Sequence, residues 1–298
     1  MFELFSTKIL PILLFFIIGY TLKATNILKR DEASVLLKLV FYLLAPAVIV
    51  MSISTMKINE SLIFYPLTAI CIHLLMFPLG KFLSKFIKMD DKEIRVFRGA
   101  TLIMNMTFIL PFFIMFFGEK NIYLLSLFDT GNLIMITTVV YSIFVSQTED
   151  SILDKGKKLI KSPLIIALII GTIINITGFV LPKGIEVTIQ KIAEITGTVI
   201  MLALGVYFTP KFKKMKLSII IVAVKIIGML GASFIVSRIL PIDEMGRKIM
   251  LLGAFSPVGN NILTYVFITD GDMELAINVV SLSIFLSFIN VSLLLLLS

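Results

Sequence analysis

Two stretches of this 298-residue chain decide its fold: RGATLIMNMTFILPFFIMFFG at residues 98–118 and LLGAFSPVGNNILTYVFI at residues 251–268. Each is an apolar run of membrane-spanning length, and proline with amide or hydroxyl side chains interrupts each near its middle. An interior proline removes a helical hydrogen bond, and lipid offers the freed carbonyl groups no partner. The polar side chains beside each proline therefore predict two broken helices inside a membrane protein.

The composition supports a membrane location. The chain is 58% hydrophobic and 15% charged, with a mean hydropathy of +1.04. Apolar runs of about 20 residues, the length that crosses a hydrocarbon core of about 30 Å, alternate with short charged clusters. The net charge of +8 does not indicate nucleic-acid binding, because the Lys and Arg residues flank apolar runs rather than covering a soluble domain. The single cysteine, Cys71, excludes a disulfide framework.

The apolar runs predict an all-α integral membrane protein with ten transmembrane helices. The first run follows Glu3 and lacks a small-residue cleavage site, so we expect it to be retained as a helix rather than removed as a signal peptide. The predicted helices cover residues 5–23, 33–55, 61–83, 94–117, 122–146, 162–181, 189–208, 217–239, 247–268 and 273–297.

The basic residues predict the orientation of these helices. Of the 27 Lys and Arg residues, 17 lie in one set of alternate loops, 8 lie at the opposite side and 2 lie within helices. The positive-inside rule places the richer set in the cytoplasm, so both termini are expected outside a multi-pass protein of the cell (inner or plasma) membrane. Only the loop after the ninth helix fits poorly, because it carries Asp270, Asp272 and Glu274.

The longest charged connection, residues 147–161, divides the chain into two halves of five helices, residues 1–146 and 162–298. Because five is odd, two halves of similar fold must enter the membrane with opposite orientations. This arrangement predicts two inverted five-helix repeats, as in many secondary transporters, with the broken helices fourth and ninth.

The residues around the two breaks are the candidate substrate-binding residues. Ser256 followed by Pro257 resembles a helix N-cap with proline at the first helical position, which predicts that a half-helix starts there and turns its positive end toward an anion. The alternative is that each proline only kinks a structural helix. Two breaks at corresponding positions favour the binding interpretation. The candidates are Asn105, Thr107, Pro111, Ser256, Pro257, Gly259, Asn260 and Asn261.

Ionisable and amide residues within the helices are candidates for ion or proton coupling. Asp129 is expensive to bury in a membrane, so it indicates either a coupling path or a partner for broken backbone, with Asn132 on the same face. Lys225 is expected either to attract an anion or pair with Asp129, or to snorkel to the surface. His73 titrates at a convenient pH, although a single buried histidine is more often a hydrogen-bonded core residue. Lys38 is expected to snorkel.

No nucleotide-binding, dinucleotide-binding or metalloprotease motif occurs, nor any Cys/His cluster. We therefore expect no metal site and no cofactor. A proton or sodium gradient, or the gradient of the substrate itself, is the expected driving force. No paired carboxylates or Ser/His pair share a helix, so an enzyme is not expected.

Three segments resemble the most recognisable stretches of the auxin efflux carrier family, in order and spacing over essentially the whole chain. These segments are NMTFILPFFIMFFGEKN at 105–121, KSPLIIALIIGTIINITGFVLP at 161–182 and FSPVGNNILTYVFITDGDMELAINVV at 255–280. Pro46 in LLAPAVIV matches a proline that the family tends to carry in its second helix. The long cytoplasmic loop of plant members is missing, which favours a compact prokaryotic-type member and a substrate other than auxin. Fewer glycines flank Pro111 than in the family.

The resemblance implies a fold similar to bile-acid symporters and sodium/proton antiporters. Helices 1, 2, 6 and 7 would form a scaffold, and helices 3–5 and 8–10 a moving core in which broken helices 4 and 9 cross. It also implies export of a small organic anion and a homodimer joined through the scaffold. Two alternatives stay open: a Na⁺-coupled organic anion symporter of bile-acid type, and a non-transporting membrane receptor or subunit.

Overall fold

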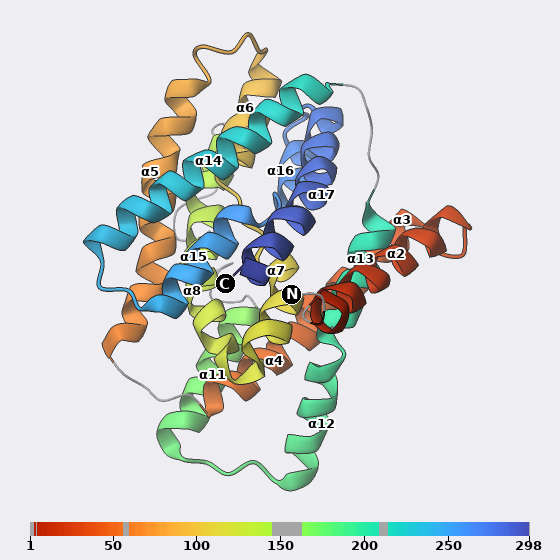
Figure 1. The fold of residues 1–298 in the computed structure, drawn as a ribbon, viewed down its shortest axis with the longest axis vertical. Coiled ribbons are helices and arrows are strands. Elements are labelled where there is room, and N and C mark those ends of the chain that lie inside the picture. The colour runs from red at the N-terminus through yellow and green to blue at the C-terminus, as the bar shows by residue number, and fades with distance from the viewer. Residues whose placement is uncertain (1–2, 4, 56–59, 145–162, 209–213, 298) are drawn as a thin grey trace.

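The fold is a bundle of helices, seen in a computed structural model that describes residues 3, 5–55, 60–144, 163–208 and 214–297 (Figure 1). No strand occurs in these ranges. The predicted linker at 147–161 lies outside them. In chain order the longer helices are α2 (Leu10–Ala24), α3 (Arg30–Leu39), α4 (Ala45–Ser54), α5 (Phe64–Leu83), α6 (Asp91–Ala100), α7 (Met106–Phe117), α8 (Ile122–Met135), α11 (Pro163–Thr177), α12 (Lys183–Glu194), α13 (Thr196–Tyr207), α14 (Met215–Ile239), α15 (Glu244–Phe255), α16 (Asn261–Ile268) and α17 (Met273–Leu297).

Short stretches complete these helices. A π-helical turn, η1 (Phe5–Ile9), precedes α2, and another, η2 (Val40–Leu44), joins α3 to α4 just before Pro46, whose missing N–H interrupts the regular ladder. The remaining stretches are the 3₁₀ turns η3 (Glu60–Ile63) and η4 (Glu119–Asn121), the π-helical turn η5 (Ile136–Val140) and the short helix α9 (Tyr141–Phe144).

Seven helical stretches of the described chain are long and apolar enough to cross a membrane. They are Phe5–Ala24, Glu32–Ser54, Glu60–Leu83, Glu119–Phe144, Lys183–Tyr207, Met215–Ile239 and Met273–Leu297. The other three predicted crossings correspond to α11, which is shorter, and to the interrupted pairs α6–α7 and α15–α16. The all-helical membrane class is therefore confirmed, and the ten-helix inverted repeat stays a prediction.

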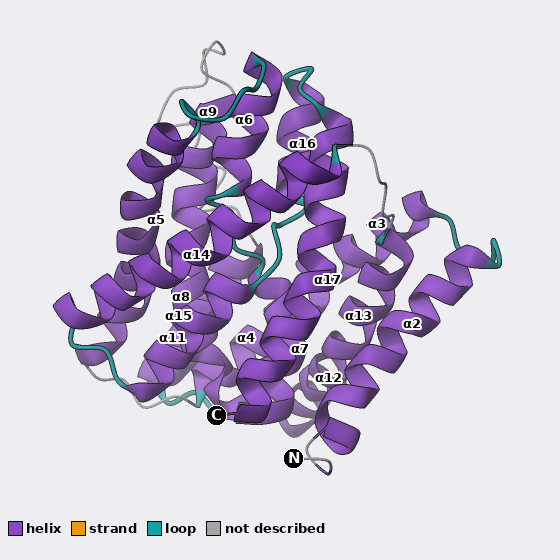
Figure 2. Ribbon diagram, turned by 45° about the horizontal axis from the view of Figure 1, so that its top comes forward, coloured by secondary structure: helices purple, strands orange, loops and turns teal. Residues whose placement is uncertain are grey.

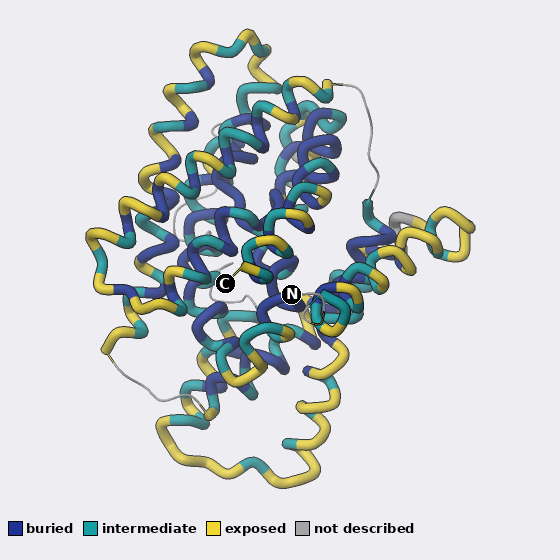
Figure 3. Tube along the Cα trace, in the orientation of Figure 1, coloured by how far each residue is buried: buried dark blue, intermediate teal, exposed yellow. Residues whose placement is uncertain are grey.

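The helices fall into two packed groups. In one, α2 packs on α13 and α4 packs on α11; in the other, α5, α8, α14, α15 and α17 pack on one another. The buried residues gather along the centre of the second group, whereas the outer faces are exposed (Figure 3). Large apolar side chains such as Ile17, Ile173 and Ile227 lie on these outer faces, as expected where lipid rather than water is the solvent.

The acidic loop that fitted the charge rule poorly has a structural explanation. Lys92 at the start of α6 pairs with Asp270 at 2.8 Å. Lys214, just before α14, pairs with Glu93 at 2.7 Å and also with Asp272. Three connections of the core thus meet at one end of the bundle, and their opposite charges compensate one another. Both chain termini lie at the other end (Figure 2).

These ion pairs shift the affinity of their members for protons. The Lys92 ammonium lowers the pKa of Asp270, and the carboxylates of Asp272 and Glu93 raise the pKa of Lys214. At neutral pH the ion pairs therefore hold these three connections together.

Glycine makes the closest helix contact in the first group possible. A Cβ added at Gly205 of α13 would lie 2.1 Å from the Phe16 carbonyl oxygen and 2.8 Å from the Tyr20 amide nitrogen of α2. Gly19 of α2 lies equally close to the backbone of α13, where its Cβ would be 2.2 Å from the Leu202 carbonyl oxygen. Small residues that let two backbones approach are typical of helix association in membranes.

We expect Gly205→Ala to separate α2 from α13 and to lower the free energy of unfolding by about 1–3 kcal/mol, the usual cost of overpacking. Thermal unfolding of the purified protein in detergent measures this. Gly231→Ala on α14 is the matched control, because its Cβ meets no atom within 4 Å and alanine favours a helix over glycine by about 1 kcal/mol. Equal stability of the two variants would contradict the close contact.

Candidate substrate cavity at the crossing of two broken helices

Two helices of the core are broken, and their breaks touch. The first break lies between α6, which ends at Ala100, and α7, which begins at Met106; the second lies between α15, which ends at Phe255, and α16, which begins at Asn261. The backbone amide nitrogen of Asn105 donates to the Pro257 carbonyl oxygen at 3.1 Å and lies 3.1 Å from the Ser256 hydroxyl oxygen. Residues 151 or more apart in sequence thus cross in the middle of the bundle (Figure 2).

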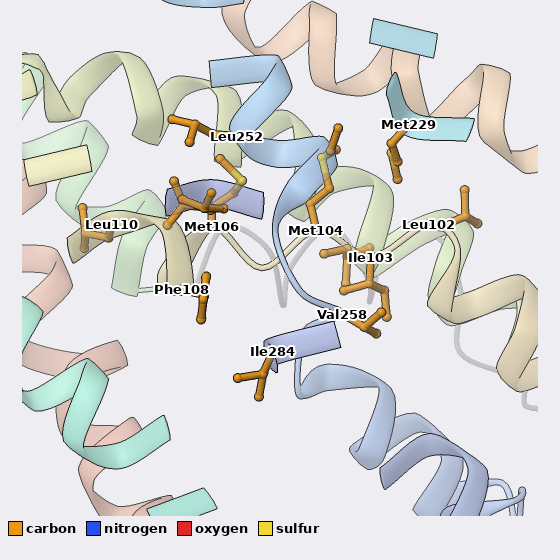
Figure 4. Packing of buried hydrophobic residues seen from close by; sticks show 14 of the residues in the cluster. Leu102, Ile103, Met104, Met106, Phe108, Leu110, Met229, Leu252, Val258 and Ile284 are labelled. Atoms are coloured by element: carbon orange, nitrogen blue, oxygen red, sulfur yellow. The ribbon is translucent and has the colours of Figure 1, made fainter. Parts of the chain in front are cut away.

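Apolar side chains surround this crossing. Ile103 and Met104 of the first break lie near Val258 of the second, with Met229 and Leu252 around them (Figure 4). A Cβ added at Gly259 would lie 2.9 Å from Ile103 Cγ2, so this position needs glycine for the breaks to pack. The crossing is therefore enclosed by core rather than by water on these sides.

Side chains from neighbouring helices bond the backbone groups that the breaks release. The Asn132 amide of α8 donates to the Met104 carbonyl oxygen at 3.1 Å, and the Ser283 hydroxyl of α17 accepts from the Val258 amide at 3.0 Å. Asn105 itself caps α7, because its side-chain oxygen accepts from the Phe108 amide at 3.1 Å. Buried polar backbone without such partners would cost about 1–3 kcal/mol per group.

Lys225 of α14 donates hydrogen bonds to the carboxyl end of α15. Its ammonium is fully buried and donates to the Ala254 carbonyl oxygen at 3.2 Å and to the Ser256 carbonyl oxygen at 2.7 Å. A positive group at the carboxyl end of a helix is favourable for the helix dipole. Lys225 therefore neither snorkels nor pairs with Asp129, and it supports the crossing from behind.

The structure corrects two predictions about where the helices restart. Pro111 does not mark the first break, because it lies inside α7, six residues after Asn105. Ser256 does not start a half-helix, because it ends α15 with extended backbone and α16 begins only at Asn261. Each helix ends where side chains from other helices can bond its backbone. The position of the proline in the sequence therefore does not determine where the helix ends.

A cavity of about 530 Å³ lies against the crossing. Five of the eight candidate substrate-binding residues line it: Asn105, Thr107, Gly259, Asn260 and Asn261. Pro111, Ser256 and Pro257 are buried and do not line it. Asp129 and Asn132 line it as well, whereas Lys225 and His73 do not. The structure thus separates residues that face the cavity from residues that hold the crossing together.

Asp129 lies between two cavities. It lines the large cavity and also a second cavity of about 40 Å³ that is bounded by residues such as Val48 and Leu110. Its carboxylate accepts from the Asn132 amide at 2.8 Å. Because the same Asn132 amide nitrogen bonds the Met104 carbonyl oxygen, Asp129 is connected to the broken backbone through one side chain.

His73 is fully buried in α5, and its ring lies beside the Leu102 carbonyl and the Asn132 amide. Its Nδ1 lies 2.8 Å from the Ala69 carbonyl oxygen, one turn back in the same helix. It therefore packs behind the first break, in a place comparable to that of Lys225 behind the second.

The sequence interpretation did not include Lys38 among the candidate site residues, although this exposed residue lines the large cavity. Ser34, Lys38, Tyr42 and Ala45 recur at helical spacing and all line the cavity. The spacing of these residues was visible in the second apolar run of the sequence.

Ser283→Ala is expected to leave the buried Val258 amide without its partner and to lower the free energy of unfolding by about 1–3 kcal/mol. Ser237→Ala is a matched control, because both serine hydroxyls also donate to a carbonyl of their own helix, but the Ser237 hydrogen bond is exposed. Thermal unfolding in detergent compares the two. If both variants keep the stability of the parent protein, the crossing does not depend on this hydrogen bond.

Comparison with known proteins agrees with this architecture. The family model described as membrane transport protein matches residues 4–295. An uncharacterised transporter of Methanocaldococcus jannaschii is 26% identical over 295 residues, which cover 94% of this chain and 92% of the relative. Members of this family are membrane transporters and not enzymes, which confirms the expectation from the sequence. The chain therefore belongs to the membrane transport protein family, the family of the auxin efflux carriers.

Proposed function

We propose that this chain is a secondary active transporter or facilitator that exports a small organic anion, a carboxylate, by alternating access at the crossing. In this proposal residues 1–146 and 162–298 form two inverted repeats of five membrane helices. The first group of packed helices is the scaffold of a homodimer, and the second group is the core that moves against it. Both termini face outward from the cell membrane.

Several paired features support the inverted repeat. Pro11 precedes Gly19 by eight residues, and Pro163 precedes Gly171 by the same number. Asp90 and Asp243 each cap the helix that leads into a break, with side-chain oxygens 2.8 Å from the amides of Glu93 and Gly246. The contact of α2 with α13 corresponds to that of α4 with α11 when the halves are exchanged.

The position of the large cavity is the observation that carries the proposal. Met106 and Thr107, at the start of α7, and Asn261, at the start of α16, all line it. Two helix N-termini therefore face one space, and helix N-termini stabilise anions through their free amides and dipoles. The amides of Asn105, Asn260 and Asn261 add hydrogen-bond donors of the kind that bind a carboxylate.

The residues that line the cavity also indicate the side of the membrane on which it lies. Its walls away from the crossing come from α3, from the end of α13 and from the start of α11, as shown by Ser34, Tyr207 and Leu164. By the charge rule these are the cytoplasmic halves of their helices. The cavity thus corresponds to an inward-facing conformation, in which the substrate enters from the cytoplasm.

Asp129 is the coupling residue in this proposal. Its carboxylate lines both cavities, so a proton on it has access to either side as the core moves. An anion that enters beside the ionised carboxylate is repelled, by about 3 kcal/mol for charges 6 Å apart at an effective dielectric constant of 20. Proton binding at Asp129 removes this repulsion and links the two events.

Counterflow in proteoliposomes tests the proposal, with a panel of labelled mono- and dicarboxylates and with or without proton and sodium gradients. At least one carboxylate is expected to exchange, and a proton gradient to drive it. Asp129→Asn is expected to keep exchange but to lose the response to the proton gradient. A response to sodium alone would favour a Na⁺-coupled symporter, and binding without movement of any acid would favour a receptor.

Asn105→Ala and Asn260→Ala are each expected to raise the half-saturating concentration of the carboxylate about tenfold, because one hydrogen bond to a charged group contributes about 1.5–3 kcal/mol. Asn121→Ala is the control: this amide donates only to the Phe117 carbonyl oxygen, at 2.7 Å, and does not line the cavity. Unchanged transport in both cavity variants would place the binding site elsewhere.

A further inference from the structure

The large cavity contains one basic side chain among its lining residues. Asp129 and Lys38 are the two lining residues that carry a charge at neutral pH, and they come from different packed groups of helices. Lys38 lies on α3, which packs on α13 of the first group, whereas Asp129 lies on α8 of the second. A charged molecule that enters the cavity therefore interacts with one positive side chain, Lys38, and one negative side chain, Asp129.

Among the described residues, the Lys38 ammonium has no partner. Within the described ranges, no carboxylate or carbonyl group forms an ion pair or hydrogen bond with it. Other lysines nearby are engaged: Lys23 donates to the Phe208 carbonyl oxygen, and Lys225 donates to two carbonyl oxygens behind the crossing. Lys38 is thus the basic group that is available to a ligand in this cavity.

Lys38 lies on the part of α3 that borders the cavity. Ser34 and Ala45, on the same face, line the cavity. Val35 and Leu39, which neighbour Lys38 on the helix, have 62% and 41% of their surface exposed, so Lys38 lies where the cavity meets the outer surface of the bundle. A positive charge at the border of a cavity attracts anions toward it and repels cations.

We propose that Lys38 is the residue that makes this cavity selective for anions, by pairing its ammonium with a carboxylate of the substrate while the crossing binds the substrate from the core. This inference rests on the proposed function for the identity of the substrate. The electrostatic effect of Lys38 on the cavity does not depend on transport, so the two can be tested separately.

A cysteine-labelling experiment measures that effect directly. Cys71 is the single cysteine of the chain, so Cys71→Ser with Asn261→Cys gives one thiol at the cavity wall. Its reaction rates are measured with two methanethiosulfonate reagents, one bearing a sulfonate and the other a trimethylammonium group. Lys38→Gln is expected to lower the ratio of the anionic to the cationic rate by about threefold or more, because the attraction and the repulsion are both lost.

Two further variants make the result specific. Lys38→Arg is expected to keep the ratio, and Lys29→Gln, at the start of the same helix but outside the cavity lining, to change it by less than about 1.5-fold. An unchanged ratio in Lys38→Gln would overturn the proposal. So would a thiol that reacts with neither reagent, because the cavity would then not admit water-borne ions.

Counterflow of the carboxylate that the parent protein transports completes the test. Lys38→Gln is expected to raise its half-saturating concentration about tenfold, and Lys38→Arg to restore it. If the parent protein transports no organic acid, the proposed function fails while the labelling ratio still decides the role of Lys38. If transport is unchanged in Lys38→Gln although the ratio falls, Lys38 does not contact the substrate and the proposal is wrong.

Discussion

The fold depends on one constraint: a helix that breaks inside a membrane must bond its released backbone groups to other parts of the protein. Lipid supplies no hydrogen bonds, and each unpaired buried group would cost about 1–3 kcal/mol. Both breaks meet this constraint in the same way, with a bond between the breaks at Asn105 and with polar side chains from neighbouring helices. The core helices are therefore arranged around the crossing, because they carry the groups that make it possible.

The two halves meet this constraint with matching positions. His73 lies beside the first break and Lys225 beside the second, and they stand 152 positions apart, as Gly19 and Gly171 do. Asn132 bonds the first break and Ser283 bonds the second, 151 positions apart. The residues differ in type while their positions correspond. His73 and Lys225 thus each lie behind a break and outside the cavity lining.

Sequence patterns predicted the parts of this structure that depend on composition and spacing. Hydropathy located the helices to within a few residues, and the two proline-containing runs located the broken helices. The exact breaks were wrong, because Pro111 is accommodated inside α7, and Ser256 ends a helix rather than starting one. The pairing of Asp270 and Asp272 with lysines distant in sequence was also not predictable, since it depends on which loops meet at one end of the bundle.

The position of Lys38 in its helix did not predict that it lines the cavity. A lysine about eight residues into a helix reaches the surface as easily as it reaches a cavity, and only the arrangement of neighbouring helices decides between them. The same arrangement gives the cavity its balance of charge. In the proposed anion site, two helix N-termini and Lys38 favour an anion, and the ionised Asp129 opposes it. Because Asn132 connects Asp129 to the Met104 carbonyl oxygen, a change of charge at Asp129 alters a hydrogen bond of the crossing itself. In the proposed transport cycle, a ligand, a proton and the broken backbone therefore act on one another over a few bonds, as alternating access requires.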